Sequence, residues 1–171
     1  NYDLFIKDGE VTAKATVTNV GEYSGKEVLQ LYYSAPQGKL GKPAKELGAF
    51  AKTKLLAPGE SEELTLTFDV KDMASFDDLG KISKSAYVLE KGDYKFHIGT
   101  SVRDTGELDF TYTVEEDTVT EQLQNWCRPF KLKRRLRANG KTERLPVGKE
   151  KYYYGEVAPS GANVPETLVK F

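Results

Sequence analysis

The chain has 171 residues, 39% of them hydrophobic and 30% charged, which is enough for one domain with a sizeable core or for a domain of about 100 residues with an extension. Its 25 basic and 26 acidic residues give a net charge of -1, which provides no general attraction to nucleic acid or to an anionic membrane, and no apolar run approaches the roughly 20 residues of a membrane span. The single cysteine, Cys127, excludes an intrachain disulfide and a multi-cysteine zinc site, so we expect a reducing, cytoplasmic setting.

Segments in which apolar and polar residues alternate occupy the first two-thirds of the chain, at residues 11–18, 64–68, 94–98 and 108–114. Alternate side chains of a strand point to opposite faces, so each segment predicts a strand with one buried face. Residues 28–33 are more apolar and predict a central strand. Turn residues separate the segments, at Asn19–Gly21, Ala57–Glu60, Lys91–Asp93 and Asp104–Gly106. This pattern predicts an all-β, antiparallel β-sandwich over residues 1–114.

A different pattern begins after Val114 with a run of three acidic residues. Thr118 and Glu121 have the spacing of a capping box, in which the two side chains accept hydrogen bonds from the first amides of a helix. Pro129 disfavours helix just before it. We therefore expect a short helix that starts at Thr118 and ends near Cys127.

Residues 115–171 form an extension in this interpretation. Residues 130–136 read as a strand, and the Asn139–Gly140 pair is typical of the turn in a hairpin with a return strand over residues 142–145. Residues 146–171 are rich in Pro, Gly and Tyr without a period, so we expect an irregular arm. The extension would connect the sandwich to an adjacent domain.

Four ordered stretches resemble the fibronectin type III-like domain of the family-3 glycoside hydrolases, the β-glucosidase group. The stretches are V-T-N-V-G at 17–21, K-E-V-L-Q-L-Y-Y-S at 26–34, K-P-A-K-E-L at 42–47 with Phe50 and L-L-A-P-G-E-S at 55–61, and Y-V-L-E-K-G-D-Y-K-F-H-I-G-T-S at 87–101. Each stretch alone is weak evidence for the resemblance, but the four together, in this order and spacing, make it specific. The resemblance implies an immunoglobulin- or fibronectin III-like sandwich.

The resemblance also implies a function. In the family, the nucleophilic aspartate belongs to a (β/α)8 barrel and the acid/base glutamate to a neighbouring α/β domain, and neither domain is in this chain. The implied role is therefore a non-catalytic module that supports the catalytic domains of the same polypeptide and helps to shape the substrate cleft, with a β-linked oligosaccharide at the domain interface. Because the chain starts at Asn1 and continues for 57 residues after Val114, it resembles domain-permuted members in which the sandwich precedes the barrel.

The residues themselves give no catalytic, metal or cofactor site. Glycoside hydrolysis needs two carboxylates on either side of the scissile bond, about 5–9 Å apart. The adjacent carboxylates of the chain, at Asp77–Asp78, Glu62–Glu63 and Glu115–Glu116, are expected to lie in water.

Three other features have simple explanations. His97, the only histidine, falls on the polar phase of its strand and is expected to be exposed rather than a ligand or base. Cys127 is expected to be a buried thiol. The basic run over residues 128–144 is expected to be a solvated face or to pair with acidic residues of another domain, rather than to bind nucleic acid.

Two groups of residues remain as candidates for contact with other molecules. A segment with a rigid proline, charges of both signs and apolar side chains has the composition of an interdomain contact, and its residues are Lys42, Pro43, Lys45, Glu46, Leu47 and Phe50. The alternative is a crossover whose apolar side chains pack inward. Trp126, Tyr152, Tyr153 and Tyr154 could stack on sugar rings, as in a carbohydrate-binding module, or bury the extension against its host.

Overall fold

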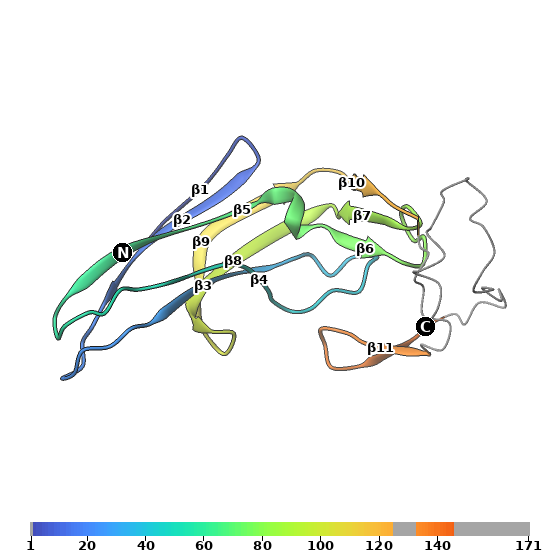
Figure 1. Ribbon diagram of the computed structural model, residues 1–171. Helices are drawn as coiled ribbons and strands as arrows, with labels where there is room; N and C mark the ends of the chain where they lie inside the picture. The colour runs from blue at the N-terminus through green and yellow to red at the C-terminus, as the bar shows by residue number, and fades with distance from the viewer. Residues whose placement is uncertain (1, 125–132, 146–171) are drawn as a thin grey trace, which may run out of the picture. The chain divides into compact units, whose positions relative to one another are not determined.

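A computed structural model describes residues 2–124 and 133–145 (Figure 1). The chain divides into two compact units, of which one contains strands β1 to β10 and the other contains β11 and β12. The elements, in chain order, are β1 (Tyr2–Lys7), β2 (Glu10–Thr18), β3 (Val28–Ser34), β4 (Glu46–Lys52), β5 (Ser61–Asp69), the 3-10 turn η1 (Val70–Met73), β6 (Ser75–Asp77), β7 (Ala86–Leu89), β8 (Gly92–Ser101), β9 (Asp104–Val114), β10 (Thr118–Gln122), β11 (Arg134–Leu136) and β12 (Thr142–Arg144). No helix in the described part of the chain is long and apolar enough to cross a membrane.

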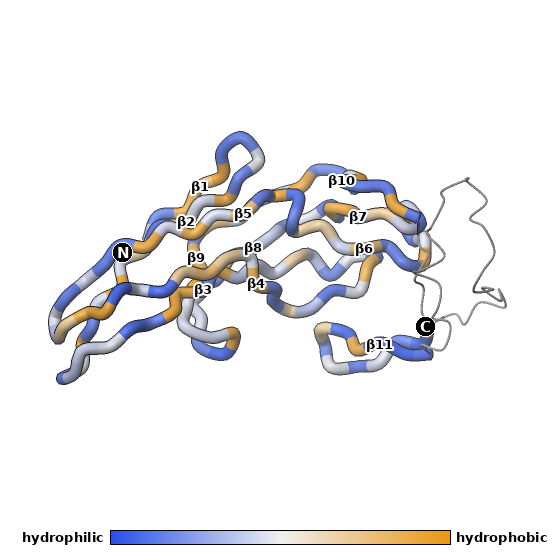
Figure 2. Tube along the Cα trace, viewed as in Figure 1, coloured by the Kyte–Doolittle hydropathy of each residue, from blue (hydrophilic) through white to orange (hydrophobic). Residues whose placement is uncertain are grey.

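Two antiparallel sheets enclose the core of the first unit. One has the strand order β4-β3-β8-β9 and the other β1-β2-β5. The register of β2 against β5 places Val11 opposite Phe68 and Ala13 opposite Leu66, so the apolar phases of both strands share one face. These side chains join Leu31 and residues of β8 and β9 in one buried cluster, and Figure 2 shows the alternation of hydrophobic and hydrophilic residues along the strands. The predicted all-β sandwich is confirmed.

The third sheet of this unit corrects one prediction. Its order is β10-β7-β6, and β10 occupies the start of the expected helix at Thr118. The strand runs antiparallel to β7, with Gln122 opposite Ala86, and the amide of Leu123 donates to the carbonyl of Ser85 at 2.9 Å. An isolated helix of about ten residues is marginal in water, so the free edge of β7 outweighs the local capping signal. The domain boundary at Val114 stays a prediction.

β11 and β12 of the second unit pair as two antiparallel strands. Arg135 of β11 lies opposite Glu143 of β12, and the guanidinium donates to the Glu143 carboxylate at 3.1 Å. The turn contains Gly140 at φ +76°, a conformation that glycine adopts without strain, and the Asn139 side chain accepts a hydrogen bond from the amide of Lys141 at 3.0 Å. The hairpin predicted from the Asn139–Gly140 pair is confirmed, whereas the predicted arm and the thiol of Cys127 lie outside the described residues.

Candidate functional site

The crossover loop, residues 35–45 between β3 and β4, is folded around a buried ion pair. The Lys42 ammonium contacts the carboxylate of Glu90, which follows β7, and the two side chains are 0% and 4% exposed. The ammonium also donates to the carbonyl of Pro36 at 2.6 Å. Lys42 was expected to contact another domain, but its charge is used inside the module.

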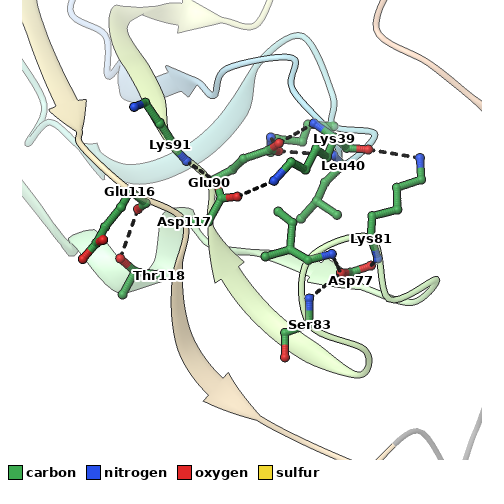
Figure 3. A network of polar contacts seen from close by, with 12 residues as sticks. Lys39, Leu40, Asp77, Lys81, Ser83, Glu90, Lys91, Glu116, Asp117 and Thr118 are labelled. Carbon is green, nitrogen blue, oxygen red and sulfur yellow. Dashed lines mark hydrogen bonds and ion pairs between the residues drawn. The ribbon is translucent and has the colours of Figure 1, made fainter.

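Glu90 completes the anchoring of the loop through backbone contacts. Its carboxylate accepts hydrogen bonds from the amides of Lys39 and Leu40 (Figure 3), and the hydroxyl of Tyr94 donates to its carbonyl at 3.1 Å. A Cβ atom at Gly38 would overlap the carboxylate, so the loop can approach Glu90 only with glycine there. Two buried charges are tolerated because the remaining polar atoms find partners, and this arrangement holds the loop in one conformation.

A second polar contact holds the exposed side of the loop. The ammonium of Lys39 lies 2.8 Å from a carboxylate oxygen of Asp117, in the segment between β9 and β10. The other oxygen of Asp117 accepts a hydrogen bond from the amide of Lys91 at 2.9 Å (Figure 3). These hydrogen bonds, from Lys39 first and from Lys91, lower the pKa of the Asp117 carboxyl. The loop, the turn after β7 and the approach to β10 therefore form one connected network.

Asp77 organises the neighbouring turn. Its carboxylate accepts hydrogen bonds from the amides of Lys81, Ile82 and Ser83 at 3.0, 2.7 and 2.9 Å. Burial raises the pKa of this carboxyl, but the amide donors outweigh it and the net shift is downward. The expectation that Asp77 lies in water is wrong, because its side chain is buried as the cap of a turn, whereas Glu115 and Glu116 are exposed as expected.

Leu47 and Phe50 project from β4 away from the core. Phe50 lies opposite Gln30, and Leu47 lies opposite Tyr32. The register shifts between these pairs, and at the shift a Cβ atom on Gly48 would lie 2.5 Å from the Phe68 ring. The extra residue keeps both apolar side chains on the outer face, where they are 48% and 68% exposed. The alternative that they pack inward is therefore wrong.

Tyr32 and His97 are buried on the same side of the sheet as Leu47 and Phe50. They are cross-strand partners on β3 and β8, and each is only 7% exposed. The Tyr32 hydroxyl donates to the side-chain oxygen of Gln30, whose amide donates to the carbonyl of Thr100 at 2.7 Å.

His97 is held by Ser34. The Ser34 hydroxyl donates to the carbonyl of Ala44 at 2.8 Å and lies 2.9 Å from His97 Nε2. A hydroxyl carries one hydrogen, so Nε2–H of His97 must donate to Ser34 Oγ. Burial, and then the charge of Lys45, lower the pKa of the imidazole. The expectation of an exposed His97 is wrong because neighbouring side chains cover the polar phase of β8.

The other predicted contact residues divide between the inside and the surface. Pro43 is exposed and Lys45 is half-buried, with its ammonium donating to the Thr105 hydroxyl at 2.6 Å. Glu46 lies opposite the inward-facing Tyr33. Burial raises the pKa of the Glu46 carboxyl, and the charge of Lys42 opposes this shift. Trp126 and Tyr152 to Tyr154 lie outside the described residues. The structure thus brings Lys45, Leu47 and Phe50 to one surface and directs Lys42 and Glu46 inward.

Sequence reasoning missed Glu90, Gln30 and Tyr32. Glu90 sits in an ordinary E-K-G-D turn, where an exposed carboxylate is the usual expectation. Tyr32 lies in residues 28–33, where the side chains on both faces of the strand are apolar or carry an amide. That pattern is the only signal in the sequence that the outer face is covered. No group of three or more potential metal-binding side chains occurs among residues 2–124 and 133–145.

Comparisons with known proteins agree with this architecture. Residues 27–102 match the fibronectin type III-like domain family. A Beta-glucosidase A of Butyrivibrio fibrisolvens is 52% identical over 158 residues, which cover 92% of this chain and 19% of that protein. A β-glucosidase of Ruminococcus albus is 43% identical over 123 residues, covering 71% of this chain and 13% of that protein. The chain therefore spans about a fifth or less of the length of these relatives.

Solved structures show the same relationship. The crystal structure of a β-glucosidase from Paenibacillus barengoltzii superposes with a TM-score of 0.72 at 44% identity, over 88% of this chain and 18% of that one. A β-glucosidase from Kluyveromyces marxianus in complex with glucose gives a TM-score of 0.61 at 27% identity, over 72% and 15%. The chain is therefore a fibronectin type III-like domain with an extension. It is similar to a segment of these β-glucosidases.

Proposed function

We propose that this chain is a non-catalytic module of a β-glucosidase-type glycoside hydrolase and that it supports the catalytic domains of the same polypeptide. One observation carries the proposal: a loop fixed by the buried Lys42–Glu90 pair lies directly before a strand whose Leu47 and Phe50 project into solvent. Apolar anchors on a rigid surface are what a stable contact between domains requires.

Rigidity matters because every group that becomes ordered on association costs conformational entropy. The crossover loop is held by Glu90 on its buried side and by Asp117 on its exposed side. Leu47 and Phe50 lie on a paired strand of a four-stranded sheet. A neighbouring domain therefore meets a surface that loses little freedom on contact, which suits a mechanical support at the edge of a substrate cleft.

The test asks separately whether this chain hydrolyses a glycoside and whether it stabilises the full-length enzyme. The isolated chain is expected to give no turnover of an aryl β-glucoside, whereas the full-length polypeptide turns it over. Removal of residues 2–124 from the full-length polypeptide is expected to shorten the half-life of this activity on heating. Turnover by the isolated chain, or a deletion without any effect on activity or its half-life, contradicts the proposal.

The carbohydrate-binding alternative gains no support from the described aromatic residues. A sugar-binding platform needs exposed rings aligned on one face, but the exposed rings are spread over β1, the β2–β3 connection, β4 and β7, at Tyr2, Phe5, Tyr23, Phe50 and Tyr87. We expect no binding when the chain is titrated with cello-oligosaccharides. Micromolar affinity for such a ligand contradicts a purely structural role.

A further inference from the structure

We propose that the outer face of the four-stranded sheet is the surface on which a neighbouring domain of the same polypeptide docks. The outer face is defined by Gln30, Tyr32, Leu47, Phe50 and His97, with Lys45 and Lys52 at its ends. The chemistry of this face identifies the partner as an apolar pocket with an acidic rim. The inference rests on the proposed supporting function and adds to it the face and the kind of partner.

The apolar part of the outer face is unusual for a surface that stays in water. Single exposed hydrophobic side chains are common, but Leu47 and Phe50 are neighbours on the same face, at 48% and 68% exposure. They lie beside Tyr32 and His97, which are buried, at 7% exposure each. Apolar anchors next to a desolvated layer resemble the centre of a protein interface, where water is excluded.

The polar groups of the face are satisfied within the module. Tyr32 donates to Gln30, Gln30 donates to the carbonyl of Thr100, and His97 pairs with Ser34. Each of these side chains already has a hydrogen-bond partner within the module, so a domain that covers them needs to provide few hydrogen bonds. The complementary surface can be apolar at its centre.

Positive charges lie at both ends of the apolar pair. Lys52 is exposed at the end of β4, and Lys45 precedes its start. Neither lysine forms an ion pair within the described part of the chain, since Lys45 donates to the neutral hydroxyl of Thr105. Glu46 faces the inner side opposite Tyr33. Glu107, which lies opposite His97, is paired with Lys95 at 2.7 Å. Charge complementarity therefore favours an acidic rim around the partner's pocket.

The partner docks through side chains rather than by adding a strand. β4 is an edge strand of its sheet, and exposed edges can pair with a new strand. Here the register shift at Gly48 interrupts the edge, and lysines at its ends are typical of edges protected from pairing.

The length of the related proteins supports a neighbouring domain as the partner of this face. The described strands belong to a chain that makes up 19% and 13% of the length of its Butyrivibrio and Ruminococcus relatives. A longer polypeptide of this kind has ample surface in the same molecule to cover the face. We therefore commit to a domain outside residues 1–171, rather than to a second copy of the chain or to residues 146–171.

The first test is zero-length coupling of lysines to carboxylates by a carbodiimide in the full-length polypeptide. Lys45 and Lys52 are expected to couple to aspartates or glutamates outside residues 1–171, as mass spectrometry of the digest detects. Lys14, exposed on β2 in the other sheet, is the matched control and is expected to give no such product. Coupling to residues 146–171, to a second copy, or to Lys14 alone overturns the inference, as does the absence of any product from Lys45 and Lys52.

The second test is the double variant Leu47→Asp/Phe50→Asp in the full-length polypeptide. Two acids on this face repel an acidic rim and cannot enter an apolar pocket, so the module should undock and proteolysis between the domains should become about tenfold faster or more. Val20→Asp, at an exposed apolar position between β2 and β3, is the control and should have no effect. The circular dichroism spectrum of the isolated variant checks that the sandwich still folds.

The neutral variant Leu47→Asn/Phe50→Ser separates loss of the apolar contact from added charge, and it should show a smaller acceleration in the same direction. If removal of residues 2–124 destabilises the enzyme while the double aspartate variant behaves like Val20→Asp, the docking face is wrong and the supporting function stands. If the deletion has no effect either, both fail. A change in oligomeric state with undisturbed domains assigns the face to a second copy and overturns the inference.

Discussion

The Lys42 ammonium and the Glu90 carboxylate face each other with almost no access to solvent, at side-chain exposures of 0% and 4%. The pair joins the crossover loop to the turn between β7 and β8, 48 residues further along the chain. Its charges are compensated by each other, by the Pro36 carbonyl and by the amides of Lys39 and Leu40. The loop that leads into Leu47 and Phe50 therefore depends on one buried electrostatic contact.

Replacing Lys42 by Met should strongly destabilise the sandwich. The variant keeps the apolar stem but leaves the Glu90 carboxylate buried without its counter-charge, which costs about 3–5 kcal/mol in comparable buried pairs. Urea denaturation of the purified chain measures the change in the free energy of unfolding. Lys71→Met is the matched control, because Lys71 pairs with Asp69 on the surface and exposed pairs contribute little.

A second substitution should recover much of that loss. In Lys42→Met/Glu90→Gln, no charge remains buried. The oxygen of the introduced side-chain amide can still accept from the amide of Lys39, whereas the amide of Leu40 donates to the other carboxylate oxygen and loses that acceptor, which limits the recovery. The double variant is therefore expected to be more stable than Lys42→Met alone. An equal or lower stability contradicts the view that the unpaired Glu90 charge is the main cause.

Substitution of Gly48 by Ala should disturb the outer face. The new Cβ atom would lie 2.5 Å from the Phe68 ring, so β4 or the ring must shift, at a cost of about 1–3 kcal/mol. Gly106→Ala is the control, since nothing lies within 4 Å of a Cβ atom there. Thermal unfolding compares the two variants, and an unchanged midpoint for Gly48→Ala contradicts the crowding seen between β4 and β5.

The strands were predictable because their signal is local. Alternation in residues 11–18 and 64–68 places the apolar side chains of both strands on one face, and the observed register of β2 against β5 uses this phase. Leu47 and Phe50 were named from composition alone. Their outward direction could not be predicted, because it depends on the register shift at Gly48.

The errors in prediction have non-local causes. Residues 118–122 carry a capping signal for a helix, but the free edge of β7 provides the hydrogen bonds that a strand needs. His97 lies on the polar phase of β8 and is nevertheless covered, through its contact with Ser34 and the segment that reaches Lys45. Glu90 gave no signal, because only the fold brings it to Lys42.

Substitution of Asp77 by Ala should loosen the turn between β6 and β7. The change removes the acceptor of three backbone amides, those of Lys81, Ile82 and Ser83, and a buried donor without a partner costs about 1–3 kcal/mol. Hydrogen exchange at these amides should become faster. Asp3→Ala on the exposed face of β1 is the control, and equal exchange in both variants contradicts the capping role.

The stability of the sandwich should fall as the pH is lowered through the range in which a free imidazole is protonated, from about pH 7 downward. Burial, and then the charges of Lys45 and Lys95, lower the pKa of His97, and Glu107 opposes this shift. The unfolded chain therefore takes up the proton at a higher pH than the folded chain does. Since the unfolded state binds more protons in this window, the free energy of unfolding decreases as the pH falls.

His97→Gln isolates this contribution, because His97 is the only histidine of the chain and a glutamine amide can still donate to Ser34 Oγ. The free energy of unfolding should be measured for both chains from about pH 7.5 to about pH 5.5. As the pH falls, the parent chain should lose stability relative to His97→Gln. Glu46 acts in the opposite direction, since burial raises the pKa of its carboxyl and the folded state binds that proton more readily. Its effect is common to both chains and cancels in the difference, so a difference that does not vary with pH contradicts a lowered pKa for His97.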